Sequence, residues 1–211
     1  MGIPAMTIDH VTSVVEDPVD ACNQLREAHG IGSERSGYLD YAGARSWLVP
    51  LRPPSYLELL SIEDEAAARM STAGRQLLNR LDTGGGLVAW SVLVDDLTRV
   101  SERLDIPIFD YTKTDDHGVV RGWRSVTGPP HLPFFIEYGG ADARAVRLRD
   151  IYARVGHRTA PTAFSQLTIS GSENEILEWL GPHRLPLRYV SGRNGLIEAR
   201  IATSTGGVVI Q

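Results

Sequence analysis

Residues 55–62 read Ser-Tyr-Leu-Glu-Leu-Leu-Ser-Ile, a short apolar run with one acid at its centre. Side chains alternate along a β-strand, so Tyr56, Glu58 and Leu60 share one face of the strand that this run predicts. The Glu58 carboxylate therefore points in the same direction as apolar neighbours. Because an isolated buried charge is too costly to keep, we expect Glu58 to be paired, protonated or bound to a cation.

A second run has the same character. Residues 132–138 read Leu-Pro-Phe-Phe-Ile-Glu-Tyr, which is again aliphatic and aromatic with a single acid, Glu137. The two acids lie about eighty residues apart. This spacing indicates that a structural unit is duplicated in the chain.

The elements predicted around the two runs follow one order. A strand rich in β-branched residues at 7–15 precedes a helix that Asp17 caps and Gly30 ends, and three strands follow, the last carrying Glu58. An apolar strand at 87–94 opens the second unit, which ends on the Glu137 strand. Each unit is thus β-α-β-β-β, and we predict an α+β protein built from paired modules of this kind.

The rest of the chain connects or extends these modules. We predict a first module at 7–62, a helical connector at 63–86, a second module at 87–140, a second connector at 141–163 and a partial third βαβββ module at 164–211. Residues 144–158 of the second connector are basic, and such a charge run is typical of a solvated face. An odd module leaves a sheet edge unpaired, which favours a homodimer.

Composition limits the classes of partner. A formal net charge of -5 gives no overall attraction to phosphate backbones, so nucleic acid is not an expected partner. Cys22 is the only cysteine, so no internal disulfide can form. The N-terminus lacks the pattern of a signal peptide, and no apolar run approaches the roughly 18 residues that span a bilayer. We therefore expect a cytoplasmic protein with no membrane partner.

The ordered motifs resemble a known family. Ile8-Asp9-His10-Val11 opens the first unit and Tyr56-Leu57-Glu58-Leu59 ends it, as in the vicinal oxygen chelate superfamily. The stretches Leu132 to Glu137, Gly118 to Trp123 and Trp90-Ser91-Val92 are similar to its glyoxalase-like domain branch. The resemblance covers about residues 7 to 140.

The resemblance implies an open barrel of curled sheets around a divalent metal. By position, it implies that His10, Glu58 and Glu137 are metal ligands, while the fourth ligand position falls on Ala89, which has no donor atom. One imidazole and two carboxylates suit Zn, Fe, Mn or Ni and leave positions open for two adjacent substrate oxygens. A metal held in this way polarises a carbonyl, and Glu137 is either the third ligand or the catalytic base.

Two hypotheses of function follow. The first is a metal-dependent lyase, isomerase or dioxygenase that acts on a small oxygenated substrate. The second is a metal-free protein that sequesters a small apolar or aromatic ligand in the same cavity, which the vacancy at Ala89 favours. In the structural alternative, His10 is an ordinary strand histidine, and the two glutamates pair with Arg45 or Arg121.

Overall fold

The computed structural model describes residues 6–211, apart from the side chains of residues 141 and 142. The first module comprises β1 (Met6–Val14), α1 (Pro18–His29), β2 (Glu34–Leu39), a 3-10 turn (Asp40–Ala42), β3 (Ala44–Pro50) and β4 (Tyr56–Ile62). Helices α2 (Glu65–Met70) and α3 (Thr72–Leu81) lead to β5 (Gly86–Val94), α4 (Leu97–Leu104), β6 (Phe109–Thr114), β7 (Val120–Val126) and β8 (Phe134–Glu137). Helix α5 (Ala141–Arg154) precedes β9 (Ala163–Ser170), α6 (Glu173–Leu180), β10 (Leu187–Val190), β11 (Gly195–Thr203) and β12 (Gly206–Ile210).

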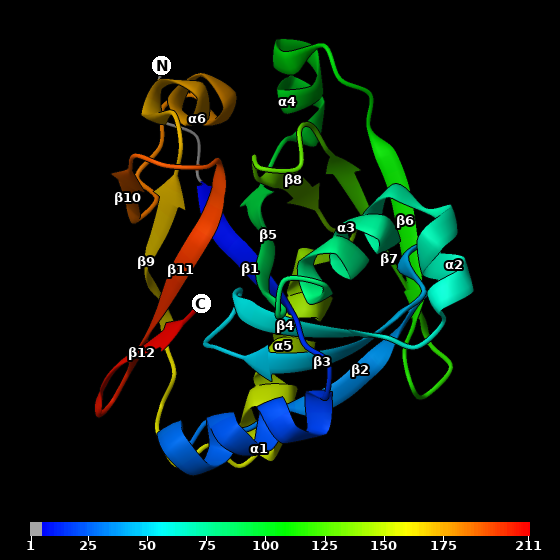
Figure 1. The fold of residues 1–211 in the computed structure, drawn as a ribbon, viewed down its shortest axis with the longest axis vertical. Helices are drawn as coiled ribbons and strands as arrows, with labels where there is room; N and C mark the ends of the chain where they lie inside the picture. Colours follow the sequence, from blue (N-terminus) through cyan, green and yellow to red (C-terminus); the bar gives the residue numbers. More distant parts are fainter. Residues whose placement is uncertain (1–5) are drawn as a thin grey trace.

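The strands form two sheets (Figure 1). The first is a barrel in the order β1-β4-β3-β2-β6-β7-β8-β5, and the second has the order β10-β9-β11-β12. Within the barrel, β1 pairs with β4 and β5 pairs with β8 in parallel, while β1 and β5 join the two modules in antiparallel register. The pair of Tyr38 with Thr114 joins β2 to β6 and closes the ring. The predicted α+β class with barrel-forming modules is confirmed.

Local sequence explains where the helices begin and end. The Asp17 side chain accepts hydrogen bonds from the backbone N–H groups of Val19 and Asp20, and Gly30 adopts the left-handed conformation after α1, as predicted. The helical connector expected at 63–86 forms two helices divided at Ser71, whose side chain caps α3. A Cβ on Gly74 would lie 2.3 Å from the carbonyl oxygen of Ala68, so only glycine permits this close approach of α2 and α3.

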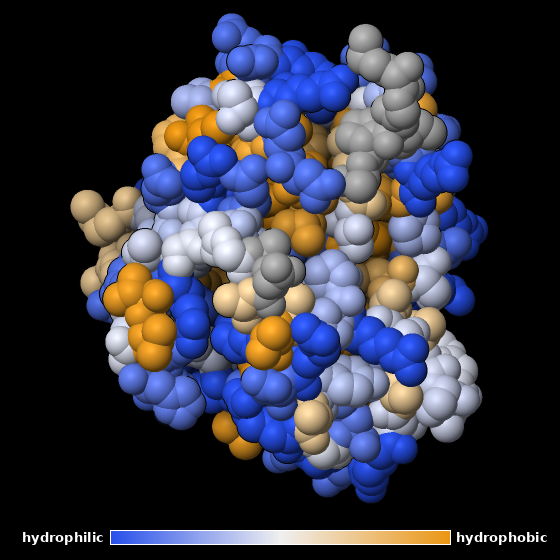
Figure 2. Space-filling view, turned by 180° about the vertical axis from the view of Figure 1, so that it is seen from behind, coloured by the Kyte–Doolittle hydropathy of each residue, from blue (hydrophilic) through white to orange (hydrophobic). Residues whose placement is uncertain are grey.

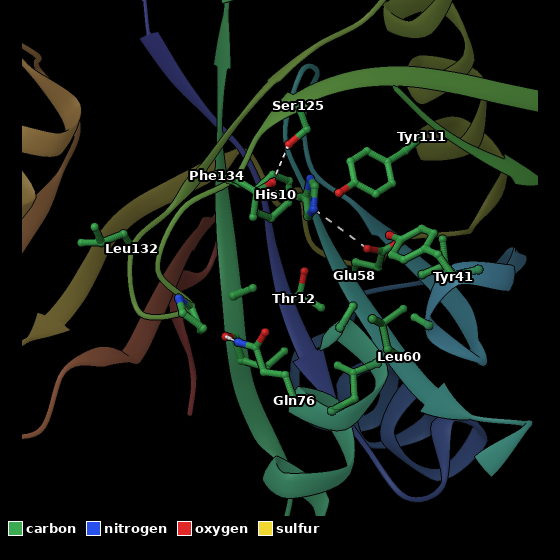
Figure 3. A pocket seen from close by; sticks show the side chains of 18 of the residues that line it. His10, Thr12, Tyr41, Glu58, Leu60, Gln76, Tyr111, Ser125, Leu132 and Phe134 are labelled. Atoms are coloured by element: carbon green, nitrogen blue, oxygen red, sulfur yellow. Dashed lines mark hydrogen bonds and ion pairs between the residues drawn. The ribbon is translucent and has the colours of Figure 1, made fainter. Parts of the chain in front are cut away.

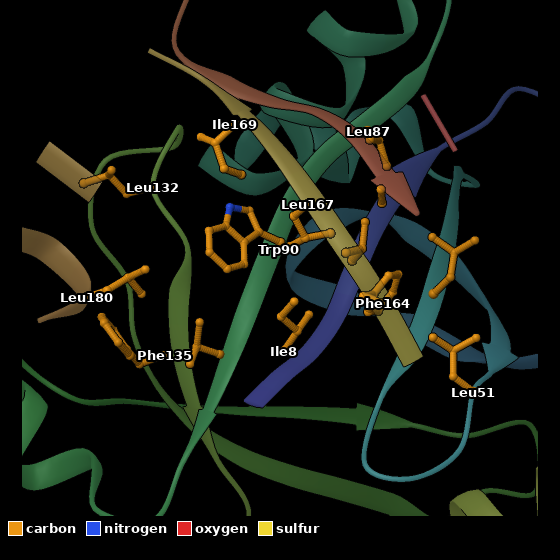
Figure 4. Close-up of a cluster of buried hydrophobic side chains, with 14 of the residues drawn as sticks. Ile8, Leu51, Leu87, Trp90, Leu132, Phe135, Phe164, Leu167, Ile169 and Leu180 are labelled. Carbon is orange, nitrogen blue, oxygen red and sulfur yellow. The ribbon is translucent and has the colours of Figure 1, made fainter. Parts of the chain in front are cut away.

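The largest hydrophobic cluster fills the space between the barrel and the second sheet (Figure 4). Trp90 on β5 is 1% exposed and faces Leu167 and Ile169 of β9. Successive side chains of a strand alternate between its faces. The side chains on the outer face of β5 therefore pack in this core, and those on its inner face point into the barrel. The third module thus covers one outer wall of the barrel.

Helix α5 corrects the expectation for the basic connector. Leu148 and Ile151 of α5 are fully buried against Leu48 and Tyr56. In the antiparallel register, Leu48 lies opposite Glu58, so the two side chains share one face of the sheet. Helix α5 therefore packs against the face that carries Glu58, and its arginines do not form a uniformly solvated surface.

The outer surface is mainly hydrophilic on the face shown in Figure 2, with small apolar areas separated by polar side chains. Within residues 6–211, no helix combines the length and apolar character needed to cross a membrane.

Candidate functional site

The barrel encloses a cavity of about 190 Å³ (Figure 3). Most of its wall is apolar, and His10 and Glu58 supply ionisable groups. Helix α3 contributes Gln76 and Leu77 to the wall. Seven further side chains along the wall carry a hydroxyl group or an aromatic ring: Thr12, Tyr41, Tyr111, Trp123, Ser125, Thr127 and Phe134.

The His10 ring is held on β1 by contacts on its edge and on its faces. Its Nδ1 atom lies 2.7 Å from Asp9 Oδ2 and 2.8 Å from Ser91 Oγ. The ring stacks on Tyr56 at a centroid distance of 4.8 Å and meets the edge of Phe134 at 5.4 Å. These contacts fix the ring so that Nε2 faces Glu58.

Asp9 is the group that orients His10, and a β-bulge makes this possible. The register between β1 and β5 shifts between Ile8 and His10, which lets the neighbouring side chains of Asp9 and His10 meet. Asp9 is fully buried and also accepts hydrogen bonds from Tyr138 and Arg144. Because the Asp9 carboxylate serves as an acceptor for all three neighbours, the Nδ1–H group of His10 donates to it, and Nε2 is left on the side of Glu58.

Glu58 on β4 is held from its other side. Its Oε1 atom accepts a hydrogen bond of 2.6 Å from Ser46 Oγ and lies 3.4 Å from Lys113 Nζ. Burial works to raise the pKa of Glu58, but Lys113, the His10 ring and Ser46 together lower it below its ordinary value. The second oxygen, Oε2, lies 3.9 Å from His10 Nε2. A buried carboxylate thus stays ionised beside the cavity.

Lys113 and Asp9 are site residues that the sequence analysis did not single out. Lys113 is buried on β6 and also donates a hydrogen bond of 3.1 Å to Ser36. It is the only lysine of the chain, since all other basic residues are arginine or histidine. A single lysine in the strand before the Asp-Asp-His-Gly turn of the second module could have identified Lys113 as a candidate site residue from the sequence. Asp9 gave no such signal, because an unbulged strand would place its side chain on the opposite face from His10.

The structure brings His10 and Glu58 together but places Glu137 elsewhere. The Glu137 carboxylate forms an ion pair with Arg124 and accepts a hydrogen bond from the backbone N–H of Leu97. It is absent from the cavity wall formed by the described residues. The alternative pairing with Arg45 or Arg121 is wrong for both glutamates, because those arginines bind Glu63 and Asp116, and Asp115, respectively.

Strand register explains the position of Glu137. Thr12 pairs with Glu58 in the first module, and Ser91, its counterpart in the second, pairs with Phe134. Phe134 therefore occupies the position equivalent to Glu58, and it lines the cavity. Glu137 follows three residues later, and an odd step along a strand reverses the face on which a side chain lies.

The residues present do not fit the expected three-ligand metal centre. In the described part of the chain, no group of three or more His, Cys, Asp or Glu side chains is placed to hold a metal ion. Ala89 lines the cavity at the fourth ligand position and offers no donor. Both His10 Nδ1 and Glu58 Oε1 are already engaged by protein groups.

Comparison with known proteins places the chain in a family. A family model described as glyoxalase-like domain matches residues 8–183. The chain belongs to the glyoxalase-like domain family. This membership confirms the resemblance to the vicinal oxygen chelate superfamily. No protein of curated function matches this glyoxalase-like chain.

Solved structures are similar to this glyoxalase-like protein. A hypothetical protein from Staphylococcus aureus has a TM-score of 0.66 at 13% identity, covering 91% of this chain and 88% of that one. Methylmalonyl-CoA epimerase from Streptomyces coelicolor, in complex with 2-nitronate-propionyl-CoA, has a TM-score of 0.49 at 15% identity over 64% and 100% of the two chains. The epimerase from Mycobacterium tuberculosis has a TM-score of 0.48 at 18% identity over 65% and 91%. At 13% identity, the likeness to the Staphylococcus aureus protein is one of fold alone, which does not fix function.

Proposed function

We propose that this glyoxalase-like protein is an enzyme that moves a proton on a small oxygenated organic molecule bound in the barrel cavity. The observation that carries the proposal is the approach of His10 Nε2 to Glu58 Oε2, at 3.9 Å. This separation is too long for a hydrogen bond, so both atoms remain able to contact a third atom. Ionisable groups held in this way beside an apolar cavity are typical of functional sites.

His10 acts as the general base in this proposal. Asp9 holds its Nδ1 proton, so Nε2 can accept a proton from a carbon next to a carbonyl and return it to the substrate. The imidazolium that forms lies between the carboxylates of Asp9 and Glu58, which stabilise it. Tyr41 lines the cavity and is a candidate donor to the developing oxyanion, since partial desolvation raises the pKa of its hydroxyl and keeps it protonated.

Solvent hydrogen exchange tests the proposal without knowledge of the natural substrate. Protein in D2O is incubated with phenylacetone or with phenylpyruvate, and the loss of the C–H signal next to the carbonyl is followed by NMR. We expect exchange above the protein-free rate, with a loss of about 100-fold in His10→Gln. His117→Gln, in an exposed turn, is the matched control and should exchange as the wild type does. Wild-type exchange at the protein-free rate for both compounds would contradict the proposal.

A metal-dependent form of the reaction is the hypothesis drawn from the family resemblance. His10 and Glu58 would supply two donors, fewer than the three expected, so the proton transfer proposed above is assigned to side chains alone. Metal analysis of protein purified without chelator tests the hypothesis on the wild type, His10→Ala and Glu58→Ala. Metal present in the wild type and lost from both variants would support the hypothesis, and equal near-zero content in all three would contradict it.

A second candidate function is sequestration of a small apolar ligand. Two observations favour it: most of the cavity wall is apolar, and Lys113 compensates the charge of Glu58. A sequestering protein would show a higher melting temperature with hydrophobic compounds but no exchange above the protein-free rate. It is contradicted if no such compound raises the melting temperature.

A further inference from the structure

A second cavity lies against the same pair of residues. It has a volume of about 70 Å³, and His10, Glu58, Tyr41 and Phe134 line both this cavity and the larger one. The remaining side chains around the smaller cavity include three cations, Lys113, Arg121 and Arg147. Glu58 is the only carboxylate among its described lining residues. The small cavity is therefore the electropositive end of the barrel interior.

Among the described residues, each cation near this cavity has a carboxylate partner except one. Lys113 pairs with Glu58, Arg121 with Asp115, and Arg144 with Asp9. Arg147 of α5 is partly buried and lines the cavity, but no described side chain pairs with it or accepts a hydrogen bond from it.

The surroundings of Arg147 raise the free-energy cost of its unpaired charge. Burial is the largest influence on the pKa of the Arg147 guanidinium and lowers it; Arg121 and Arg144 act in the same direction, while Tyr56 and Tyr138 oppose them. An arginine stays protonated in proteins, so Arg147 carries a partly buried charge without a counterion among the described side chains. In the part of the chain that the structure describes, each of the other three cations is neutralised by its carboxylate. The charge of Arg147 is therefore the one that stays uncompensated at the small cavity. A monoanionic group would neutralise it.

We propose that the substrate is a small carboxylic acid whose carboxylate binds Arg147 in the small cavity while its apolar body fills the larger one. The proposal rests on the proposed function, since a carboxylate held at Arg147 places the nearby carbons of the substrate, including one next to a carbonyl, beside His10 and Glu58. A planar carboxylate matches the fork of N–H donors on a guanidinium. A phosphate dianion would instead leave a net negative charge beside Glu58.

Binding of two matched probes tests the proposal. By titration calorimetry, 3-phenylpropanoate is compared with its neutral analogue 3-phenylpropanamide. We expect the wild type to bind the acid at least about tenfold more tightly than the amide, as for a charged hydrogen-bonded pair. Arg147→Leu should lose this preference, Arg147→Lys should keep part of it, and Arg149→Leu, an exposed neighbour on α5, should keep all of it.

Stability provides a second readout that a folding defect would not reproduce. Without ligand, we expect Arg147→Leu to melt at or above the wild-type temperature, because the substitution removes an uncompensated charge. A preference for the acid that survives in Arg147→Leu, or a wild type that binds acid and amide equally, would overturn the proposal.

The two proposals fail in different ways. If the acid binds through Arg147 but no exchange occurs in D2O, the anion site stands and the proton-transfer function is wrong. The anion site predicts faster exchange of phenylpyruvate than of phenylacetone, and loss of this difference in Arg147→Leu. If exchange occurs but Arg147→Leu does not change the ratio of the two rates, the function stands and the anion site is wrong.

Discussion

Lys113 and Glu58 form a buried pair of opposite charges. Each charge offsets the free-energy cost of burying the other. Lys113 is 7% exposed, as is Glu58, and the ammonium group has only Ser36, Ser46 and Glu58 as partners within the described residues. Lys113→Met leaves Glu58 without its cation, and we expect the free energy of unfolding to fall by about 3 kcal/mol. Urea denaturation measures this change.

The double variant separates loss of the pair from loss of packing. Lys113→Met combined with Glu58→Gln removes both charges, so it should be more stable than Lys113→Met alone. Equal stability of the single and double variants would show that the lysine stem, rather than the ion pair, matters.

The ionised state of Glu58 makes the stability of the fold depend on pH. Its pKa in the folded protein is below the ordinary value of 4.5, despite the opposing effect of burial. A carboxyl with a lowered folded pKa stabilises the fold above its unfolded pKa and loses this contribution as the pH falls through the folded value. We expect the stability difference between wild type and Glu58→Gln to be constant above about pH 6 and to shrink as the pH falls below about 5 toward the folded pKa. Chemical denaturation at several pH values measures it, and a constant difference would contradict the expectation.

Some residues of the site could be predicted from the sequence, and others could not. Glu58 was recognisable because an acid in an alternating apolar strand needs a partner, and the structure supplies one. The partner itself, Lys113, comes from a strand in the other module, and only tertiary pairing brings it near. Asp9 was hidden by a bulge, which changes the side-chain direction without a mark in the sequence.

At the scale of elements, β8 shows how a repeated motif can mislead. Both Glu58 and Glu137 lie in similar apolar runs, but Phe134 occupies the equivalent position in the parallel pair. A shift of three residues cannot be seen from composition, because both faces of β8 are apolar. Helix α5 shows the converse case: its arginines indicated a solvated run, whereas Leu148 and Ile151 anchor the helix to the barrel.

The position of Glu137 leads to a prediction for this strand. Glu137→Gln removes an ion pair with Arg124 that is partly exposed, and keeps an acceptor for the N–H of Leu97. We expect the exchange rate in D2O to stay within about twofold of the wild type and the stability to fall by less than about 1 kcal/mol. Exchange at the protein-free rate in Glu137→Gln would instead assign Glu137 the role of catalytic base.

At the scale of the whole molecule, the second sheet leaves β10 and β12 at its edges. The homodimer expected from an odd module stays a prediction, because an edge strand with unpaired backbone groups is suited to pairing with a second copy. Sedimentation equilibrium measures it, and a monomer at all protein concentrations would contradict it.

The third module also reaches the cavity wall. Trp179 of α6 donates a hydrogen bond of 2.7 Å to the carbonyl oxygen of Pro133, and His131 lies 2.9 Å from Glu175. A Cβ on Gly128 would lie 2.1 Å from the Trp179 ring, so the indole packs directly on the loop 127–133. Because Gly128 and Leu132 of this loop line the large cavity, α6 fixes one wall of the site without touching a ligand.

This connection predicts an effect on binding at a distance. Trp179→Phe keeps an aromatic ring but removes the donor to Pro133, so the loop 127–133 should exchange its amide hydrogens faster, and stability should fall by about 1 kcal/mol. We expect a several-fold weaker affinity for 3-phenylpropanoate, because the loosened wall must be ordered on binding. Trp47→Phe, which removes a half-buried indole from β3, is the matched control and should leave loop exchange unchanged. If the loop protection and affinity of Trp179→Phe equal those of the wild type, the third module only covers the barrel and does not position the cavity wall.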